Sequence, residues 1–281
     1  MLYFVFTIDG DWKEYFELKL KDEERLPKEG VLLDLVQREI DLADKVLKGR
    51  FIHFIHTSPL ARDFFLEKNF RKLWKDVLKN NGDAGLHCHE DYYYQDASRM
   101  KKTISAGVSL FKKSGLDVKC YRGGFLGFSK DMVRILEGNK IHFDFSCEPG
   151  RFLKHEDTLI ADWRGAPEHQ YRMSYDNHCQ SGDSKVWEIP LGTSQGKSLY
   201  FEKSSIEDIE KIALDLKEQS IENKIDIVAS VLSHTYEFES VERIKNIEKN
   251  LTALKKYGTF INLKELEKYL WKNGRGSFPT P

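Results

Sequence analysis

The sequence predicts an α/β fold, namely a distorted (β/α) barrel of about seven parallel strands with helices outside. Short apolar runs alternate with longer amphipathic runs along most of the chain, and uninterrupted apolar runs are typical of strands buried on both faces of a parallel sheet. About seven or eight such strand–helix units follow one another, which favours closure into a barrel over an open sheet. The length of 281 residues suits one domain of this kind. We therefore predict a single barrel domain over residues 1–272 and a flexible tail at 273–281.

Local signals justify the elements in turn. Strands are predicted where β-forming apolar residues run together, and helices where apolar residues recur every three or four positions. Gly49 ends the first helix, and Ser205 with Asp208 is typical of a capped helix start. A long polar stretch at 148–185, rich in His, Arg, Tyr and Trp, indicates an elaborated functional loop. The predicted strands are residues 3–8, 51–56, 84–86, 118–121, 142–145, 186–189, 225–232 and 259–261, and the predicted helices are residues 31–48, 60–79, 97–113, 130–137, 205–222 and 241–257.

The charge balance excludes two classes of partner. Lys and Arg number 44 and Asp and Glu 45, a net charge of −1, so we expect neither nucleic acid nor an anionic membrane surface as a partner. No apolar run approaches the roughly 20 residues of a membrane span. The chain start has neither a basic segment nor a cleavage site, so we expect no secretion signal and a cytoplasmic protein. The four cysteines form no C-x-x-C pair and are expected to be reduced thiols. The sequence leaves the oligomeric state open.

Polar residues follow the predicted strands at the ends that form the active face of a parallel α/β barrel. Carboxylates, histidines and one arginine therefore converge on one rim, which is the constellation of a metal-assisted hydrolase. In chain order these residues are Asp9, Asp11, His56, His87, His89, Asp91, Arg122, Asp144, Glu188 and His234.

Two pairs on this rim have the spacing of a metal site. Residues two apart on a strand point the same way, so Asp9 can share a site with Asp11, and His87 with His89. A carboxylate and two imidazoles suit a catalytic divalent metal such as zinc, and the second carboxylate is free to take a proton. Taken alone, the D-x-D sequence is more typical of an ordinary strand-to-loop turn than of a metal site. The two histidines, taken alone, are as typical of loop residues as of metal ligands.

Two other histidines, His53 and His56, do not share this spacing. They lie three residues apart, so on a strand they face opposite sides. We expect one to be packed and the other to lie at the rim, without binding one metal together.

Taken in order, these segments resemble the polysaccharide deacetylase family, which has the NodB-homology fold and forms carbohydrate esterase family 4. The first motif is similar to the D-x-D form of the more divergent branches of that family. The resemblance covers about residues 3–236, and several motifs in the right order are more specific than any one of them. The segments that carry it are Thr7-Ile-Asp-Gly-Asp-Trp, Gly85-Leu-His-Cys-His, Tyr121-Arg-Gly-Gly-Phe, Phe143-Asp-Phe-Ser, Trp187-Glu-Ile-Pro and Leu232-Ser-His-Thr-Tyr.

The resemblance implies a bound divalent metal, most often zinc, and a role for each matching residue. The roles it implies are Asp9 as general base, Asp11 and His87 as metal ligands, Arg122 as the residue that holds Asp9, His234 as general acid and Asp144 as the residue that orients His234. The family's histidine motif is H-x-x-x-H, whereas the residue four past His87 is Asp91. Strand geometry favours His89 as the third ligand, and position in the motif leaves Asp91 as the alternative.

The expected function is removal of the N-acetyl group from an amino sugar in polysaccharide or surface-glycan biosynthesis, with an N-acetylated carbohydrate as substrate. Two alternatives stay open. One is a metal-dependent amidase that cleaves a non-sugar C–N bond. The other is a catalytically silent barrel that binds a glycan or a protein partner, which the altered histidine motif keeps open.

Overall fold

The computed structural model describes residues 1–281 except 18–20, 27, 59–60, 62–63, 90–92 and 274–281. Within this part of the chain the main sheet has nine strands in the order β12-β1-β2-β3-β4-β5-β9-β8, with β13 also paired to β1. Every adjacent pair is parallel except β8 with β9. The strands are β1 (Leu2–Asp9), β2 (Ile52–His56), β3 (Asp83–Cys88), β4 (Cys120–Gly123), β5 (Phe143–Asp144), β8 (Tyr171–Arg172), β9 (Trp187–Glu188), β12 (Ile227–His234) and β13 (Thr259–Phe260).

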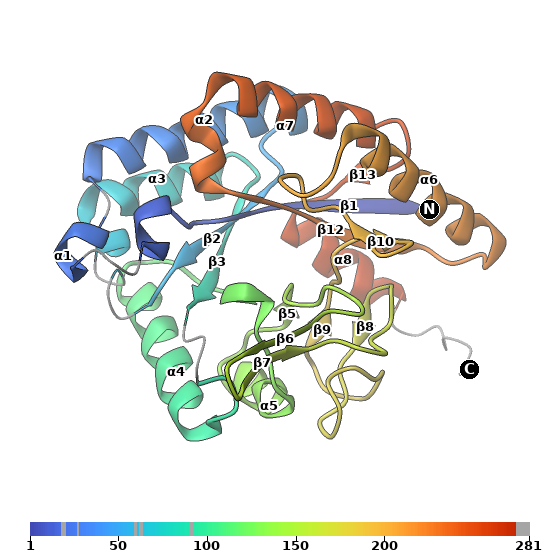
Figure 1. Ribbon diagram of the computed structural model, residues 1–281, viewed down its shortest axis with the longest axis horizontal. Helices are drawn as coiled ribbons and strands as arrows, with labels where there is room; N and C mark the ends of the chain where they lie inside the picture. The colour runs from blue at the N-terminus through green and yellow to red at the C-terminus, as the bar shows by residue number, and fades with distance from the viewer. Residues whose placement is uncertain (18–20, 27, 59–60, 62–63, 90–92, 274–281) are drawn as a thin grey trace.

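Main-chain hydrogen bonds connect the two ends of the parallel sheet. The Ser230 N–H of β12 donates to the carbonyl of Pro190 at 2.8 Å, and the Gly192 N–H donates to the carbonyl of Ser230 at 3.0 Å. The segment after β9 thus reaches β12, and the sheet curls into a distorted barrel with helices around it (Figure 1). The expected barrel of parallel strands is confirmed.

Helices cover the outside of this sheet. Ser205 caps α6 by accepting a hydrogen bond from the Asp208 N–H, as its sequence predicts. The predicted helix over 60–79 is partly wrong: α3 begins only at Lys68, after a short 3₁₀ turn over Phe64–Leu66, in which Phe65 and Leu66 are buried in the core. The helices are α1 (Asp22–Arg25), α2 (Glu29–Leu47), α3 (Lys68–Lys79), α4 (Ala97–Lys113), α5 (Lys130–Gly138), α6 (Ile206–Glu222), α7 (Val241–Leu254) and α8 (Leu263–Asn273), and the other 3₁₀ turns are Lys13–Phe16, Gly124–Leu126 and Thr235–Glu239.

Two apolar clusters follow from the alternation of side chains along each strand. On β1, Phe4, Phe6 and Ile8 belong to the larger cluster, which lies between the sheet and the helices. Val5 belongs to the smaller cluster inside the barrel, together with residues from β2, β4, β5, β9 and β12. Helix α8, which the sequence analysis did not predict, adds Leu266 to this inner cluster. The interior is therefore filled by side chains below the rim.

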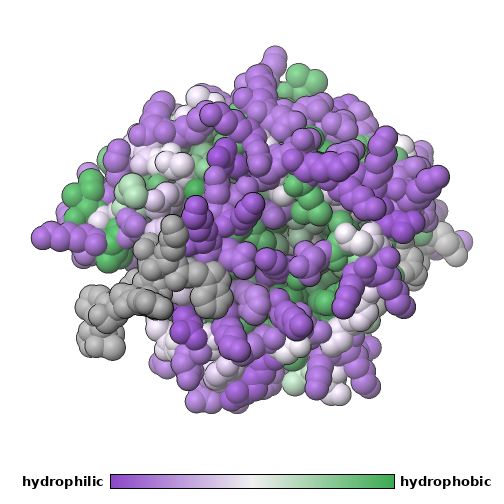
Figure 2. Space-filling model, turned by 180° about the vertical axis from the view of Figure 1, so that it is seen from behind, coloured by the Kyte–Doolittle hydropathy of each residue, from purple (hydrophilic) through white to green (hydrophobic). Residues whose placement is uncertain are grey.

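The polar stretch at 148–185 contains the hairpin of β6 (Phe152–His155) with β7 (Thr158–Asp162), and then β8. A second small hairpin pairs β10 (Thr193–Ser194) with β11 (Lys197–Ser198). The back of the molecule is predominantly hydrophilic, with hydrophobic residues in a few places (Figure 2). All four cysteines are free thiols, as predicted, and all four are buried. Among the described helices, none combines the length and the apolar character that crossing a bilayer requires.

Gly85 on β3 tests the packing of the inner cluster. A Cβ at this position would lie 2.4 Å from Cδ1 of Phe54 and 2.9 Å from Sγ of Cys120. We expect Gly85→Ala to lower the free energy of unfolding by about 1–3 kcal/mol, because overpacking a dense core forces neighbours off their rotamers. Urea denaturation measures the effect. Gly138→Ala is the matched control, since a Cβ there meets nothing within 4 Å, and equal stabilities of the two variants would contradict the packing.

Candidate active site

The carboxyl ends of β1, β2, β3, β4 and β12 place the predicted polar residues on one rim. Strand register aligns Asp9 with His234, and His87 with both His56 and Arg122. These side chains are almost fully buried. The parallel sheet therefore brings together residues that lie up to 225 positions apart in the sequence, as 234 − 9 shows.

A tight turn puts the two carboxylates of the D-x-D sequence at the same site. The Asp11 N–H donates to the carbonyl of Asp9 at 2.7 Å, and the Gly10 N–H donates to the carbonyl of Phe54 at 2.9 Å. A Cβ on Gly10 would lie 2.7 Å from Nε2 of His53 and 2.8 Å from the carbonyl oxygen of Phe54. Only glycine fits this close approach without displacing a neighbour.

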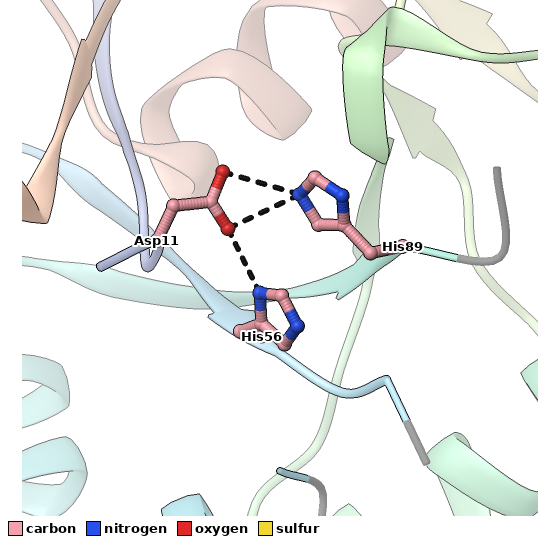
Figure 3. A group of neighbouring side chains, drawn as sticks. All are labelled: Asp11, His56 and His89. Carbon is pink, nitrogen blue, oxygen red and sulfur yellow. Dashed lines mark hydrogen bonds and ion pairs between the residues drawn. The ribbon is translucent and has the colours of Figure 1, made fainter. Parts of the chain in front are cut away.

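The Asp11 carboxylate lies among three imidazoles. Its oxygens are 2.8 Å from Nδ1 of His56 and 3.1 Å from Nε2 of His89 (Figure 3), and Nε2 of His87 is 3.5 Å away. Burial alone would raise the pKa of Asp11, but the charges of His89 and His87 and the hydrogen bond of His56 outweigh it and hold that pKa well below its usual range. The carboxylate is thus in the form that can bind a cation.

His87 has the surroundings of a metal-binding imidazole. Its Nδ1 hydrogen-bonds with the carbonyl oxygen of Arg122 at 3.0 Å, so Nδ1 carries the proton and Nε2 presents its lone pair. Nε2 is buried, has no hydrogen-bond partner among the described residues, and lies 3.9 Å from the Asp9 carboxylate as well as near Asp11. A carboxylate with neutral imidazoles is the donor set of catalytic zinc sites. The residues present therefore fit a divalent metal.

His56 belongs to this cluster although the sequence analysis did not make it a candidate ligand. Asp11, His56 and His89 have one ligand atom each within 4.8 Å of one another. The His56 ring stacks on the His89 ring at 4.8 Å, its Nε2 hydrogen-bonds with Oγ of Ser58 at 2.7 Å, and burial lowers its pKa to about 3. The usable signal was its position at the end of β2, next to β3. Asp91, the alternative third ligand, lies outside the described residues.

His53, three residues before His56, faces the other side of β2, as expected. It packs against Trp74 with ring centroids 4.7 Å apart and contacts the buried Glu39 carboxylate at 2.6 Å. It therefore takes no part in the Asp11 cluster.

Asp9 is held by a buried arginine. Nη1 of Arg122 donates to Asp9 at 2.9 Å and to Oγ1 of Thr7 at 2.8 Å, while its Nε donates to the carbonyl of Phe145 at 2.9 Å. The guanidinium also lies 4.8 Å from the centroid of the Phe54 ring. Because a buried arginine with several fixed bonds cannot swing away, it holds the Asp9 carboxylate in one orientation.

His234 pairs with Glu202, which the sequence analysis missed. Oε1 of Glu202 lies 3.3 Å from Nδ1 of His234 and accepts hydrogen bonds from the His234 N–H and from Oγ of Ser233, each at 2.9 Å. Burial would lower the pKa of His234, but the hydrogen bond and charge of Glu202, with the charges of Asp9 and Asp11, raise it above its ordinary value. Glu202 lies in the loop between β11 and α6, where no strand periodicity marks it.

The expectation that Asp144 orients His234 is wrong. Phe143 and Phe145 take the inward positions of this segment, so Asp144 faces the other side of the sheet. It accepts a hydrogen bond from Oγ of Ser146 at 2.8 Å and pairs with the buried Glu188, whose pKa burial and the Asp144 charge raise well above its ordinary value. These two carboxyl groups thus stabilise each other by sharing a proton.

A cavity of about 290 Å³ opens over the site. Asp9, Asp11, His89 and His234 lie on its wall, so the carboxylates and two of the imidazoles are accessible to a small molecule. The other lining residues are Phe16, Phe125, Leu126, Arg151, Tyr200, Lys203, Leu232 and Tyr236.

The fold is similar to that of solved polysaccharide deacetylases. A protein named as a polysaccharide deacetylase, from Mycobacterium smegmatis, matches with a TM-score of 0.64 and 12% identity over 100% of this chain and 94% of its own. Puue allantoinase matches with a TM-score of 0.59 and 11% identity over 98% and 92%. A carbohydrate esterase family 4 pseudoenzyme from Bacillus anthracis matches with a TM-score of 0.52 and 12% identity, over 94% of this chain and 64% of its own. Neither a family model nor a curated protein matches the sequence. The chain therefore has the NodB-like fold of carbohydrate esterase family 4.

The pairing of Glu202 with His234 predicts a measurable titration. We expect Glu202→Gln to lower the pKa of His234, because the neutral amide no longer stabilises the imidazolium. NMR titration of the His234 ring in the metal-free protein measures this pKa. Glu218→Gln, on the exposed face of α6, removes a charge elsewhere and serves as the control. An unchanged pKa in Glu202→Gln would show that Asp9 and Asp11 alone set the charge of His234.

Proposed function

We propose that this protein is a metal-dependent deacetylase that hydrolyses the N-acetyl group of an amino sugar in polysaccharide or surface-glycan biosynthesis. One observation carries the proposal. Asp9, which is bonded by Arg122, and His234, which is paired with Glu202, both lie next to Asp11 and the imidazoles around it. The Asp9 carboxylate and the His234 imidazole lie 4.0 Å apart at one cavity. A base and an acid at this separation can act on the same amide group of a substrate. The deacetylase-like fold is consistent with this assignment.

Asp11, His87 and His89 would hold the metal, for which we propose zinc. In this assignment His56 is a positioning residue, because its Nδ1 contacts the Asp11 carboxylate while its Nε2 is engaged by Ser58. A bound zinc ion would polarise the amide carbonyl and acidify a bound water. Thiolates are absent from the described cluster, and carboxylate with imidazole suits zinc among the divalent metals.

The remaining steps fall to residues of the chain. Asp9, fixed by Arg122, takes a proton from the attacking water while the water oxygen forms a bond to the acetyl carbon. His234, kept protonated by Glu202, donates a proton to the amide nitrogen as the C–N bond breaks, so the products are acetate and a free amine. Aromatic side chains at the cavity wall, Phe16, Phe125, Tyr200 and Tyr236, offer faces on which a sugar ring can pack.

Substitution of the base and the acid tests these roles. We expect Asp9→Asn to abolish acetate release from N-acetylhexosamine substrates while metal content is retained, because the amide cannot accept the proton. His234→Ala should lower kcat by about 10²–10⁴, the usual contribution of general acid–base catalysis. Acetate release and metal content are measured on the same preparations. Wild-type turnover in either variant would remove that residue from the mechanism.

Metal content tests the ligand set separately from catalysis. We expect His87→Ala and His89→Ala to lose stoichiometric zinc, while His56→Ala lowers affinity by about 10–100-fold, as for residues that support a ligand. Inductively coupled plasma mass spectrometry and competition with a chelator give the two readings. His53→Ala is the matched control, since this buried histidine contacts Glu39 instead of the site. Zinc retained in His87→Ala but lost in His56→Ala would transfer the ligand role to His56.

The same measurements separate the alternatives. An amidase that acts on a non-sugar C–N bond would bind metal but release no acetate from N-acetylated sugars. A silent barrel would release none from any amide, and Asp9→Asn would leave its ligand binding intact.

A further inference from the structure

Two cationic side chains line the cavity and have no part in the proposed hydrolysis. Arg151 lies in the turn before β6, within the polar stretch at 148–185, and Lys203 lies in the loop before α6. They come from separate segments and meet at the same cavity wall. A catalytic site that needs only a metal, a base and an acid gives neither cation a function.

Arg151 is held in place with part of its guanidinium unused. Its Nη1 donates to Oε2 of Glu148 at 2.9 Å, and Oε1 of Glu148 in turn accepts from Oγ of Ser198 at 2.8 Å. Its Nε is buried without a hydrogen-bond partner in the described part of the chain. Glu148 thus fixes the guanidinium at the cavity wall, where the group can form charge-assisted hydrogen bonds with an incoming anion.

Lys203 lies near Arg151 without a carboxylate on its ammonium among the described residues. Nζ is 4.2 Å from the centroid of the Tyr200 ring. Partial burial and the positive charge of Arg151 lower the pKa of Lys203, and the charges of Glu148 and Glu202 oppose this shift only in part. Glu148 compensates the charge of Arg151 in part, and an anion bound at this wall of the cavity would be attracted to both cations.

Tyr200 indicates on which side of the substrate that anion lies. Its hydroxyl is 3.4 Å from Nε2 of His234, and its ring is the neighbour of Lys203. Because His234 is assigned to the amide nitrogen, the sugar bonded to that nitrogen lies on the Tyr200 side. The cations therefore face the sugar and not the acetyl group.

We propose that Arg151 and Lys203 form a subsite for an anionic group, a phosphate ester or a carboxylate, carried by the amino sugar itself. This rests on the proposed function for the orientation of the sugar. The substrate class is then an acidic N-acetylated sugar, such as a sugar phosphate, in preference to a neutral N-acetylhexosamine.

Binding to the zinc-loaded Asp9→Asn full chain tests the subsite without turnover. Isothermal titration calorimetry compares N-acetylglucosamine with its 1-phosphate, its 6-phosphate and N-acetylmuramic acid, which separates phosphate from carboxylate as the source of the anion. We expect at least one acidic sugar to bind at least about tenfold tighter than the neutral one, the effect of one or two charge-assisted contacts. This preference should shrink in 1 M salt, which screens such contacts.

Two further variants in the same background assign the preference to residues. We expect Lys203→Gln and Arg151→Gln each to lower the ratio of acidic to neutral affinity about tenfold or to abolish it. Lys154→Gln is the matched control, because Lys154 also lies over an aromatic ring, Phe152 at 5.7 Å, but does not line the cavity. Arg151→Gln also removes the hydrogen bond to Glu148, so a failure of this variant to fold would have a structural reason. Lys203 is an exposed side chain, and Lys203→Gln therefore keeps the test valid in that case.

Equal affinity for acidic and neutral sugars, or a preference that survives in Lys203→Gln, would overturn the subsite. Acetate release by the wild-type protein is followed in parallel. A preference for acidic sugars without acetate release would refute the deacetylase activity but not the subsite. Acetate release without such a preference would refute the subsite but not the deacetylase activity.

Discussion

The contact of one buried carboxylate, Asp11, with imidazoles from two neighbouring strands is the interaction on which the rest of the site depends. A buried carboxylate is costly unless donors or cations surround it. His56 and His89 lie within 3.1 Å of it, and His87 within 3.5 Å. The tight turn at Gly10 brings Asp11 to this position directly after β1. The barrel thus surrounds one carboxylate with imidazole nitrogens, which is the kind of donor set that a divalent cation binds.

Strand alternation made part of this arrangement predictable. The predicted strands and the rule that polar residues gather at their carboxyl ends placed Asp9, Asp11, His87 and Arg122 on one rim. The register aligns Asp9 with His234 and His87 with Arg122, and the turn after β1 brings Asp11 beside them. The assignment of Asp144 failed because Phe143 and Phe145 occupy the inward positions, so that the aspartate between them must face outward.

Residues on loops could not be placed in this way. Glu202, Arg151 and Lys203 come from connecting segments without a period, and only tertiary packing decides which side chain they approach. Helix α8 was missed for a related reason. Its residue Leu266 fills the barrel interior, and the volume it must fill is a property of the closed sheet and not of the local sequence. His56 shows an intermediate case, because its strand was predicted correctly but its proximity to Asp11 depends on the turn at Gly10.

Asp9 and Asp11, the two carboxylates of one short turn, have different hydrogen-bond partners. Asp9 is bonded by a permanently charged guanidinium, whereas Asp11 is contacted by imidazoles, whose nitrogens can bind a metal. Arg122 occupies one oxygen of Asp9, which favours the proposed role of Asp9 as the base over a role as a metal ligand. Two residues of the same type, two positions apart, can therefore serve as a base and as a ligand because their neighbours, and not their own chemistry, separate the roles.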